Sequence, residues 1–339
     1  QQNTLRIKMS HLKTVFYISL ALLSFSLTGC QKQESQQTAA AETKAAQQVQ
    51  SIAVGFQKSA LNLLVARNEK LLEQQFPNTK IEWKEFPAGP QMLEALAVGA
   101  VDYGYVGNTP PIFAQAADKA LSYVAFEKVA GNSLAVVVPK DSAIQTIQQL
   151  KGKRIAVQKG SSAHELLAKT LEKAGLSWSE IQAVWLPPAD ARAAFDKKAI
   201  DAWAIWDPFL GAAEFDSQVK VLIESSDFPQ TYSFYIGNPE FIQKHPDSPE
   251  KFIQALNASD QWILKNQAVA LDIYQKSTGL KPEVAKLAFE RRLKPSPVQP
   301  LTTEVIKAQQ NIADLFQQVQ LIPKTISVQQ QIWSPAATH

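Results

Sequence analysis

Residues 155–171 read IAVQKGSSAHELLAKTL, and the organisation of the chain can be worked out from this stretch. The apolar run 155–157 predicts a strand, and Leu166, Leu167 and Leu171 recur at helical spacing after the polar loop QKGSS. The loop therefore leads directly into a helix start, which carries unpaired backbone N–H groups and about half a positive charge. Such a start binds anions without needing a lysine. Turns of this kind occur throughout α/β proteins, so the stretch alone is weak evidence for a site.

A second copy of the pattern strengthens the prediction. Residues 52–70 read IAVGFQKSALNLLVARNEK and repeat the order of strand, Gln-Lys, serine and helix. The similarity continues between residues 81–107 and 181–206, each with a strand, a proline turn, a helix, Val/Ile-Asp and another strand. The offset between the copies drifts from about 103 to about 99 residues, which is too long for a solenoid repeat and suits a lobe. The chain is therefore predicted to form two similar α/β lobes.

The order of elements predicts that the chain crosses twice between the lobes. We expect the first lobe to comprise residues 51–138 and 232–335, and the second to comprise 139–231, with a first crossover at 138–142. Residues 232–236 are expected to form the return strand, and the helical residues after 249 to cover the first lobe. The proline-rich segment 291–300 is expected to be an extended loop. Two crossings form a hinge, which suits a protein that closes on a ligand.

The N-terminal residues have the features of an export signal. Residues 14–27 are apolar but short for a membrane span, and they end in Leu27-Thr28-Gly29-Cys30, which resembles the lipobox of bacterial lipoproteins. We therefore expect a leader and signal peptide at 1–29, a lipid on Cys30 and a flexible Gln/Ala/Thr tether at 30–50. The alternative is a plain cleaved signal with an incidental cysteine, which would leave the protein free in the periplasm. Cys30 is the single cysteine, so no intramolecular disulfide can form.

Composition and charge narrow the function classes. The chain has 339 residues, of which 45% are hydrophobic and 19% charged, as in ordinary globular proteins. Its formal net charge of +3 comes from Arg6, Lys8 and Lys13, all before Cys30, so the remainder is formally neutral. This balance argues against a nucleic-acid surface.

Catalytic and metal-binding patterns are missing from the sequence. His11 lies in the signal region and His339 at the C-terminus, and His164 and His245 have no metal-ligand spacing or cysteine partner. The nucleophile-elbow, phosphate-loop and dinucleotide glycine motifs are also missing. We therefore expect a protein that is not an enzyme and uses no metal and no cofactor.

A binding site is instead expected where strands of both lobes end. The candidate residues are Gln57, Lys58, Gly107, Asn108, Thr109, Ser161, Ser162, His164, Asp190 and Trp206. Asn108 and Thr109 would otherwise serve as plain helix caps, as would Asp190, and His164 is as well placed to cap a helix or face solvent. Alternation along the strand places one of Trp203 and Trp206 in the core, and we choose Trp206, which is nearer the strand end, for the pocket.

Several longer strings carry a family resemblance. The segments EFPAGPQMLEAL, PPIFAQAA, QKGSSAHELL, PADARAAF and DAWAIWDPF resemble the aliphatic sulfonate-binding proteins of bacterial ABC importers, over about residues 52–333. The resemblance implies the α/β two-lobe type II periplasmic-binding-protein fold, a ligand cleft between the lobes and delivery to an ABC permease in the inner membrane. A lipobox departs from many relatives, which are free periplasmic proteins.

The resemblance and the residues together predict how a ligand is held. The sulfonate would lie at the helix starts and its organic tail would lie toward Trp206. Taurine, sulfate esters and nitrate are alternative ligands, because proteins that bind them share the fold. A cytoplasmic enzyme built on the same fold and a lipoprotein with a structural role are alternatives of other classes. Delivery to a permease suits a monomer.

Overall fold

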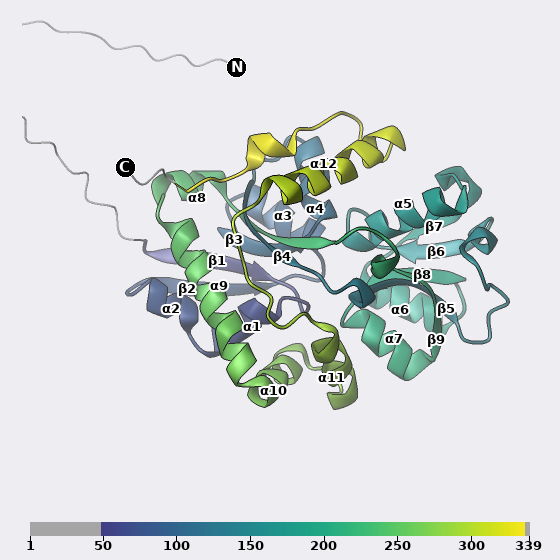
Figure 1. The fold of residues 1–339 in the computed structure, drawn as a ribbon, viewed down its shortest axis with the longest axis horizontal. Coiled ribbons are helices and arrows are strands. Elements are labelled where there is room, and N and C mark those ends of the chain that lie inside the picture. The colour runs from purple at the N-terminus through teal and green to yellow at the C-terminus, as the bar shows by residue number, and fades with distance from the viewer. Residues whose placement is uncertain (1–48, 336–339) are drawn as a thin grey trace, which may run out of the picture. The chain divides into compact units, whose positions relative to one another are not determined.

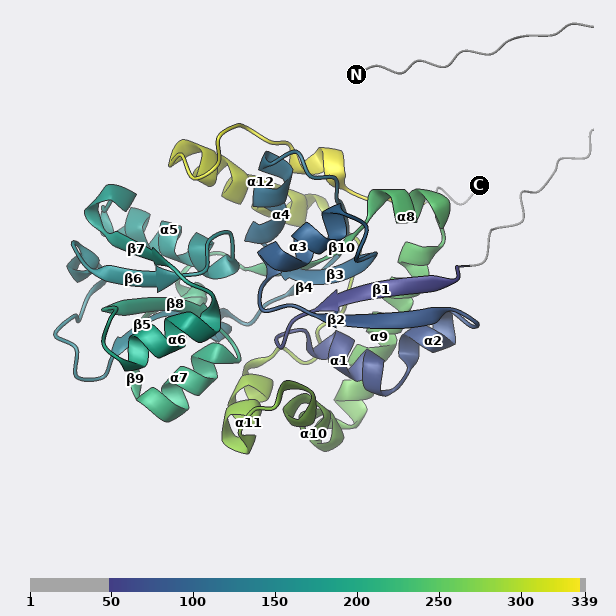
Figure 2. The same ribbon diagram turned by 180° about the vertical axis from the view of Figure 1, so that it is seen from behind.

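The computed structural model describes residues 49–335 and contains two five-stranded sheets, each between layers of helices (Figures 1 and 2). The first sheet has the order β2-β1-β3-β10-β4 and the second has the order β7-β6-β8-β5-β9. In each sheet the first three strands are parallel, and the fourth is antiparallel to the third and to the fifth. The two lobes predicted from the repeat therefore have the same strand topology.

The first lobe contains two separate segments of the chain. Its strands and helices before the crossover are β1 (Ser51–Phe56), α1 (Leu61–Asn68), α2 (Leu71–Gln75), β2 (Lys80–Glu85), α3 (Gly89–Ala97), β3 (Tyr103–Gly107), α4 (Thr109–Ala116) and β4 (Ser122–Lys128). After the return come β10 (Tyr232–Gly237), α8 (Pro239–Lys244), α9 (Ser248–Lys265), α10 (Gln267–Thr278), α11 (Pro282–Arg291) and α12 (Thr303–Gln318).

The second lobe is continuous in sequence. It comprises β5 (Leu134–Pro139), β6 (Arg154–Val157), α5 (Ser162–Ala174), β7 (Gln182–Trp185), α6 (Pro188–Asp196), β8 (Ala202–Trp206), α7 (Phe209–Ser217) and β9 (Val219–Glu224). Short 3-10 turns at Gly131–Ser133, Ile147–Leu150, Trp178–Glu180 and Ser225–Asp227 connect these elements, and a fifth at Val328–Gln331 follows α12 in the first lobe.

The repeated Val/Ile-Asp pair has a structural role that is the same in both lobes. Asp102 Oδ2 accepts the backbone N–H of Ala53 at 2.7 Å, and Asp201 Oδ2 accepts the backbone N–H of Arg154 at 2.8 Å. Asp102, just before β3, is therefore bonded to the start of β1, and Asp201, just before β8, is bonded to the start of β6. The sequence repeat thus corresponds to an equivalent hydrogen bond in each sheet, at the end where the parallel strands begin.

The predicted lobe boundary is wrong at one strand. Residues 134–138 were expected in the first lobe, but β5 pairs with β8 and β9 in the second sheet. The first crossover consequently lies at 129–133 instead of 138–142. The continuous apolar run 134–138 indicates a buried strand but does not indicate which strands it pairs with, which is why the assignment failed. The expected return strand is present as β10, which pairs with β3 and β4.

Apolar clusters cover both faces of each sheet. In the first lobe, α1, α9 and α10 pack on one face around Leu64, Phe252 and Tyr274, while α3 and α12 cover the other through Met92 and Val305. In the second lobe, α5 covers one face, and α6 and α7 cover the other. The C-terminal helices cover the first lobe as expected, and α11 and α12 also reach residues of the second lobe.

The two crossovers are bonded to each other. Val129 N–H donates to the Thr231 carbonyl at 3.0 Å, and Ser225 Oγ donates to the Gly131 carbonyl at 2.9 Å. A Cβ added to Gly131 would lie 2.8 Å from Ser226 Cα, so the segments pass too closely for a larger residue. This close pair of segments is the hinge expected between the lobes. The predicted signal peptide, Cys30 and nearly all of the tether lie outside the described residues.

Candidate functional site

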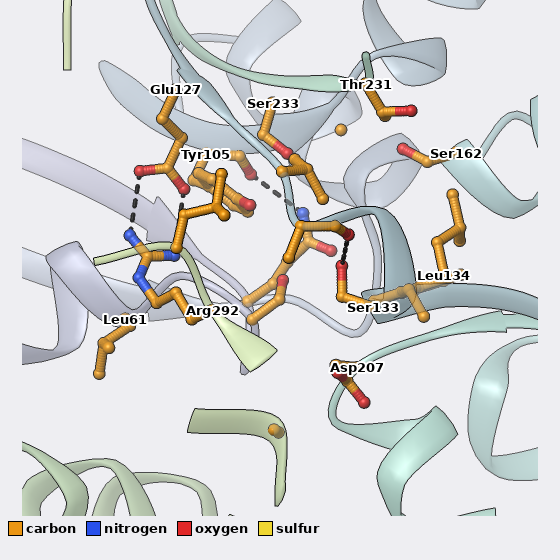
Figure 3. Close-up of a pocket in the computed structure, with 18 of the residues that line it drawn as sticks. Leu61, Tyr105, Glu127, Ser133, Leu134, Ser162, Asp207, Thr231, Ser233 and Arg292 are labelled. Atoms are coloured by element: carbon orange, nitrogen blue, oxygen red, sulfur yellow. Dashed lines mark hydrogen bonds and ion pairs between the residues drawn. The ribbon is translucent and has the colours of Figure 1, made fainter. Parts of the chain in front are cut away.

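A cavity of about 100 Å³ lies between the two lobes (Figure 3). The first lobe contributes residues from the ends of β1 and β3, from β4 and β10, and from α10 and α11, and the second contributes residues from the starts of β5 and α5 and the end of β8. The polar side chains on its wall are Gln57, Ser59, Tyr105, Glu127, Lys128, Ser133, Ser161, Ser162, Asp207, Thr231, Ser233 and Arg292. The carboxyl ends of strands from both sheets therefore meet in one place, as ligand sites of open α/β sheets do.

Four helix starts reach this cavity. Gln57 and Ser59 precede α1, Gly89 begins α3, Gly107 and Pro110 flank the start of α4, and Ser161 and Ser162 begin α5. Ser161 is buried, and its hydroxyl donates to the Gln158 carbonyl at 2.7 Å. The start of α5 presents free N–H donors, whereas Pro110 and Pro111 leave the first turn of α4 with few. Every helix start carries partial positive charge, so their convergence favours an anion.

The start of α5 and the end of β3 are in close contact across the cleft, at Ser162 and Gly107. A Cβ added to Gly107 would lie 1.9 Å from Ser162 Oγ and 3.2 Å from Ser162 Cβ. Gly107 belongs to the first lobe and Ser162 to the second, so glycine permits the approach of the lobes seen here.

A buried ion pair forms part of the cavity wall in the first lobe (Figure 3). Arg292 donates from two nitrogens to the two carboxylate oxygens of Glu127, at 3.3 and 3.1 Å. Tyr235 and Asn62 also donate to Glu127 Oε2, at 3.1 and 3.0 Å. Burial alone would lower the pKa of Arg292, but the adjacent Glu127 carboxylate, together with the nearby Tyr235 and Tyr105, raises it. Arg292 therefore stays charged, and its remaining guanidinium N–H groups are donors for a ligand.

Sequence reasoning missed this pair. Arg292 was assigned to an extended proline-rich loop, and that loop does continue to Gln299, which bridges to Phe126. Glu127 lies 165 positions earlier in the chain, so no local pattern joins the two. The adjacent arginines at 291 and 292, next to a loop, were the available signal.

Trp206 lies between the cavity and a second hollow of about 380 Å³. This outer hollow is lined by Gln57, Lys58, Ser59, Glu85, Phe86, Pro87, Pro187, Pro188, Ala189, Trp206 and Phe209. Phe209 packs edge-on against Trp206, with ring centroids 5.9 Å apart. Trp203 is 1% exposed and belongs to the core, as the alternation along β8 predicted. The outer hollow is mostly apolar, and it offers space for an apolar group next to the cavity where the helix starts converge.

The structure brings five of the candidate residues to the cavity wall: Gln57, Gly107, Ser161, Ser162 and Trp206. Lys58 lines the outer hollow, where its ammonium donates to the Thr278 carbonyl at 2.7 Å.

Four other candidates lie outside the cavity. Asn108 and Thr109 are buried at the start of α4, where the Thr109 hydroxyl donates to Asn108 Oδ1. Asp190 is exposed on α6. These positions correct the prediction that they line the pocket, because a residue at a helix start contacts the cavity only if its side chain turns toward it.

His164 is buried in an aromatic cluster, which also corrects its predicted place. It contacts the rings of Phe113, Trp178, Trp185 and Phe316. Its Nδ1 accepts the backbone N–H of Gly160 at 3.1 Å and so braces the loop before α5. Burial lowers the pKa of His164 to about 3, so its ring is neutral near neutral pH.

Among residues 49–335, no group of three histidine, cysteine or acidic residues is arranged to hold a metal ion. In the same part of the chain, no helix has the length and apolar character needed to cross a membrane.

Comparisons with known proteins agree with this geometry. Residues 80–270 match the family described as NMT1/THI5 like. An aliphatic sulfonates-binding protein of Escherichia coli (strain K12) is 40% identical over 286 residues, which are 84% of this chain and 89% of that protein.

Two solved structures share the fold at similar identity. The alkanesulfonate-binding protein of Xanthomonas axonopodis pv. citri, bound to MOPS, is 41% identical with a TM-score of 0.82, over 85% of this chain and 99% of that one. The periplasmic aliphatic sulphonate binding protein of Escherichia coli is 39% identical with a TM-score of 0.78, over 86% of this chain and 94% of that one. The fold is thus the two-lobe periplasmic-binding-protein fold. By sequence and by structure, the chain belongs to the family of aliphatic sulfonate-binding proteins, within the wider NMT1/THI5-like group.

Proposed function

We propose that this protein is the substrate-binding component of an ABC importer and holds an aliphatic sulfonate between its lobes. The observation that carries the proposal is the convergence of four helix starts and Arg292 on one cavity, next to the apolar hollow beyond Trp206. The names of the similar proteins support the same ligand class.

The sulfonate group suits the donors of the cavity. It is ionised near neutral pH, and its three oxygens accept hydrogen bonds but carry no proton to donate. The Ser162 hydroxyl, the second amide hydrogen of Gln57 and the unpaired backbone N–H groups at the start of α5 can therefore donate to it, whereas the Ser161 hydroxyl is already bonded to the Gln158 carbonyl. Each hydrogen bond to a charged group contributes about 1.5 to 3 kcal/mol. The organic tail would lie against Trp206 and extend toward the outer hollow.

In this proposal the hinge allows the two lobes to close around the ligand before its delivery to a permease. Closure would bury the ligand between lobes and present one surface made of both, which an ABC permease in the inner membrane could recognise. We propose a periplasmic location, with a monomer anchored through a lipid on Cys30. Recovery of the Cys30→Ser protein in the soluble periplasmic fraction, with the wild type retained in the membrane fraction, would support the anchor.

A binding role is also the better proposal than catalysis. The close relatives carry the names of binding proteins. The described cavity wall contains no histidine, and its Ser133 and Ser161 donate to backbone carbonyls and not to a base.

Thermal unfolding with candidate ligands tests the proposal. The purified protein would be heated with alkanesulfonates of rising length, taurine, sulfate and nitrate. A ligand at about one hundred times its Kd adds about 2.7 kcal/mol, which raises the midpoint by several degrees. A shift with alkanesulfonates and none with sulfate would show that both head and tail are recognised. No shift with any sulfonate would refute the proposed ligand class.

A further inference from the structure

Beside the cavity, α11 of the first lobe packs on α7 of the second (Figures 1 and 2). Arg291, at the end of α11, donates to Asp207 Oδ1 at 3.3 Å and also pairs with Glu214. The exposed fractions of these three side chains are 14%, 10% and 22%, so little water surrounds the charges. Removing one partner from such a pair is costly, because the other charge is left without compensation.

The contact continues toward the start of α11. The Lys281 ammonium donates to Asp216 Oδ1 at 2.6 Å and lies 5.7 Å from the centre of the Phe215 ring. A Cβ placed on Gly211 would lie 3.6 Å from Leu287 Cδ2, so the two helices pack closely between the ion pairs. Each of these pairs joins the two lobes, and together with the arginine pairs above they form what we call the α7–α11 contact.

The α7–α11 contact is next to the cavity on both lobes. In the second lobe, Asp207 lines the cavity and directly follows Trp206. In the first lobe, Arg291 is followed by Arg292, which also lines the cavity (Figure 3). A ligand that draws these two walls together therefore also brings Arg291 to its two carboxylates.

The lobes also meet at α5, through side chains of a different kind. There, Ile112 and Phe316 of the first lobe pack with Ala168 of the second, and the His164 ring stacks on Phe316. Opening about the hinge must separate at least one of the two contacts. Separated apolar side chains would be exposed to water, whereas separated charges regain their hydration, so the α7–α11 contact is the less costly one to open.

We propose that the α7–α11 contact reversibly holds the cleft closed, and that Arg291 is a positioning residue that slows ligand release. Arg291 is not among the residues that line the described cavity, so it acts through closure and not through contact with the ligand. This inference rests on the proposed function and adds the residues that determine how long a sulfonate is retained.

Stopped-flow fluorescence with butanesulfonate tests the role of Arg291. Trp206 on the cavity wall provides the signal, and the observed rate against ligand concentration gives kon as the slope and koff as the intercept. Arg291→Met should raise koff about tenfold and leave kon within about twofold of the wild type. Glu214→Gln should raise koff by less, because Arg291 keeps Asp207 as a partner.

Salt gives a second readout, through the exposed pair. The Lys281 side chain is 62% exposed, so its pair with Asp216 is open to screening. Raising NaCl from about 20 to about 500 mM should increase koff more in the wild type than in the Lys281→Met/Arg291→Met protein, which lacks both of these interlobe cations. The anion's own salt dependence is common to the two proteins and cancels in the comparison.

Arg154→Met is the matched control. Arg154 pairs with Asp201 at 2.8 Å, but both residues belong to the second lobe and neither lines the cavity. This variant also loses an arginine–carboxylate pair, and it should keep the wild-type koff.

The outcomes separate the two proposals. If the wild type binds no alkanesulfonate, the proposed function and this inference are both overturned. If it binds, but Arg291→Met and Glu214→Gln keep the wild-type koff or Arg154→Met raises koff equally, the α7–α11 contact does not hold the cleft closed, while sulfonate binding stands.

Discussion

His164 does not line the cavity, but it supports the loop that does. It is wholly buried among rings from both lobes and braces the loop that leads to Ser161. Its Nε2 has no hydrogen-bond partner in the described structure. The sequence could place it one turn into a helix, but the rings that enclose it come from α4, from α12 and from the segment that holds Trp178 and Trp185. Its burial was therefore not predictable from spacing.

Because His164 is buried neutral, stability should depend on pH through it. Its pKa is about 3 in the folded protein against an ordinary 6.5, so the unfolded chain takes up a proton first. The stability present above pH 6.5 is lost as pH falls toward 3, by up to about 1.4 kcal/mol per pH unit. Urea unfolding across this range should show a shallower loss for His164→Leu than for the wild type. His245→Leu, at the end of α8, is the control and should follow the wild type; an equally steep loss in His164→Leu would contradict the assignment.

Among the elements, the start of α5 was the best predicted from sequence. Strand β6, its polar loop and the helix follow the pattern of residues 155–171, and Ser161 and Ser162 reach the cavity. Strands β4 and β9 were not predicted, and β5 was placed in the wrong lobe. Local pattern identifies a strand-loop-helix unit, whereas strand partners depend on contacts from far along the chain.

Substitution Ser161→Asp separates helix stability from anion binding at this element. Aspartate and serine are equally favoured at helix N-termini, so α5 should still form. The thermal midpoint should fall modestly, because aspartate cannot replace the hydrogen bond that Ser161 Oγ donates to the Gln158 carbonyl. A carboxylate at the cavity wall would repel a sulfonate, so affinity should fall at least tenfold, or about 1.4 kcal/mol. Thermal unfolding and titration calorimetry on the same sample measure both.

Thr302→Asp is the matched control for that change. Thr302 caps α12 by accepting the N–H of Val305, and it is exposed and remote from the cavity. It should leave sulfonate affinity unchanged. Unaltered affinity in Ser161→Asp as well would remove the α5 start from the site.

At the scale of the whole described unit, the lobes meet on several sides of the cavity. Arg291 of α11 pairs with Asp207 and Glu214, Lys281 pairs with Asp216, and Phe316 of α12 packs on His164. The contact of Gly107 with Ser162 lies at the cavity itself. The sequence predicted the two lobes and the double crossing, but not these contacts, because they join side chains distant in sequence.

A double-mutant cycle tests whether the Gly107–Ser162 approach limits closure. Gly107→Ala should weaken sulfonate binding about tenfold, because the new methyl group overlaps Ser162 Oγ. In the Ser162→Gly background the nearest remaining atom of residue 162 is its backbone nitrogen, 3.9 Å away. The same glycine change should then cost less, which calorimetry of the four proteins measures as a coupling energy. Additive effects would mean that the two residues do not meet in the bound protein.

The placement of β10 also has a consequence for the order in which the lobes can form. The second sheet uses strands from one continuous segment, Leu134–Glu224, so it can be completed as soon as that segment is available. In the first sheet, β10 lies between β3 and β4 and arrives more than a hundred residues after β4 begins. The first lobe contains the N-terminal strands, but its sheet can be completed only after the second lobe has been synthesised. Until Tyr232–Gly237 pairs with them, β3 and β4 have unpaired edges that face each other.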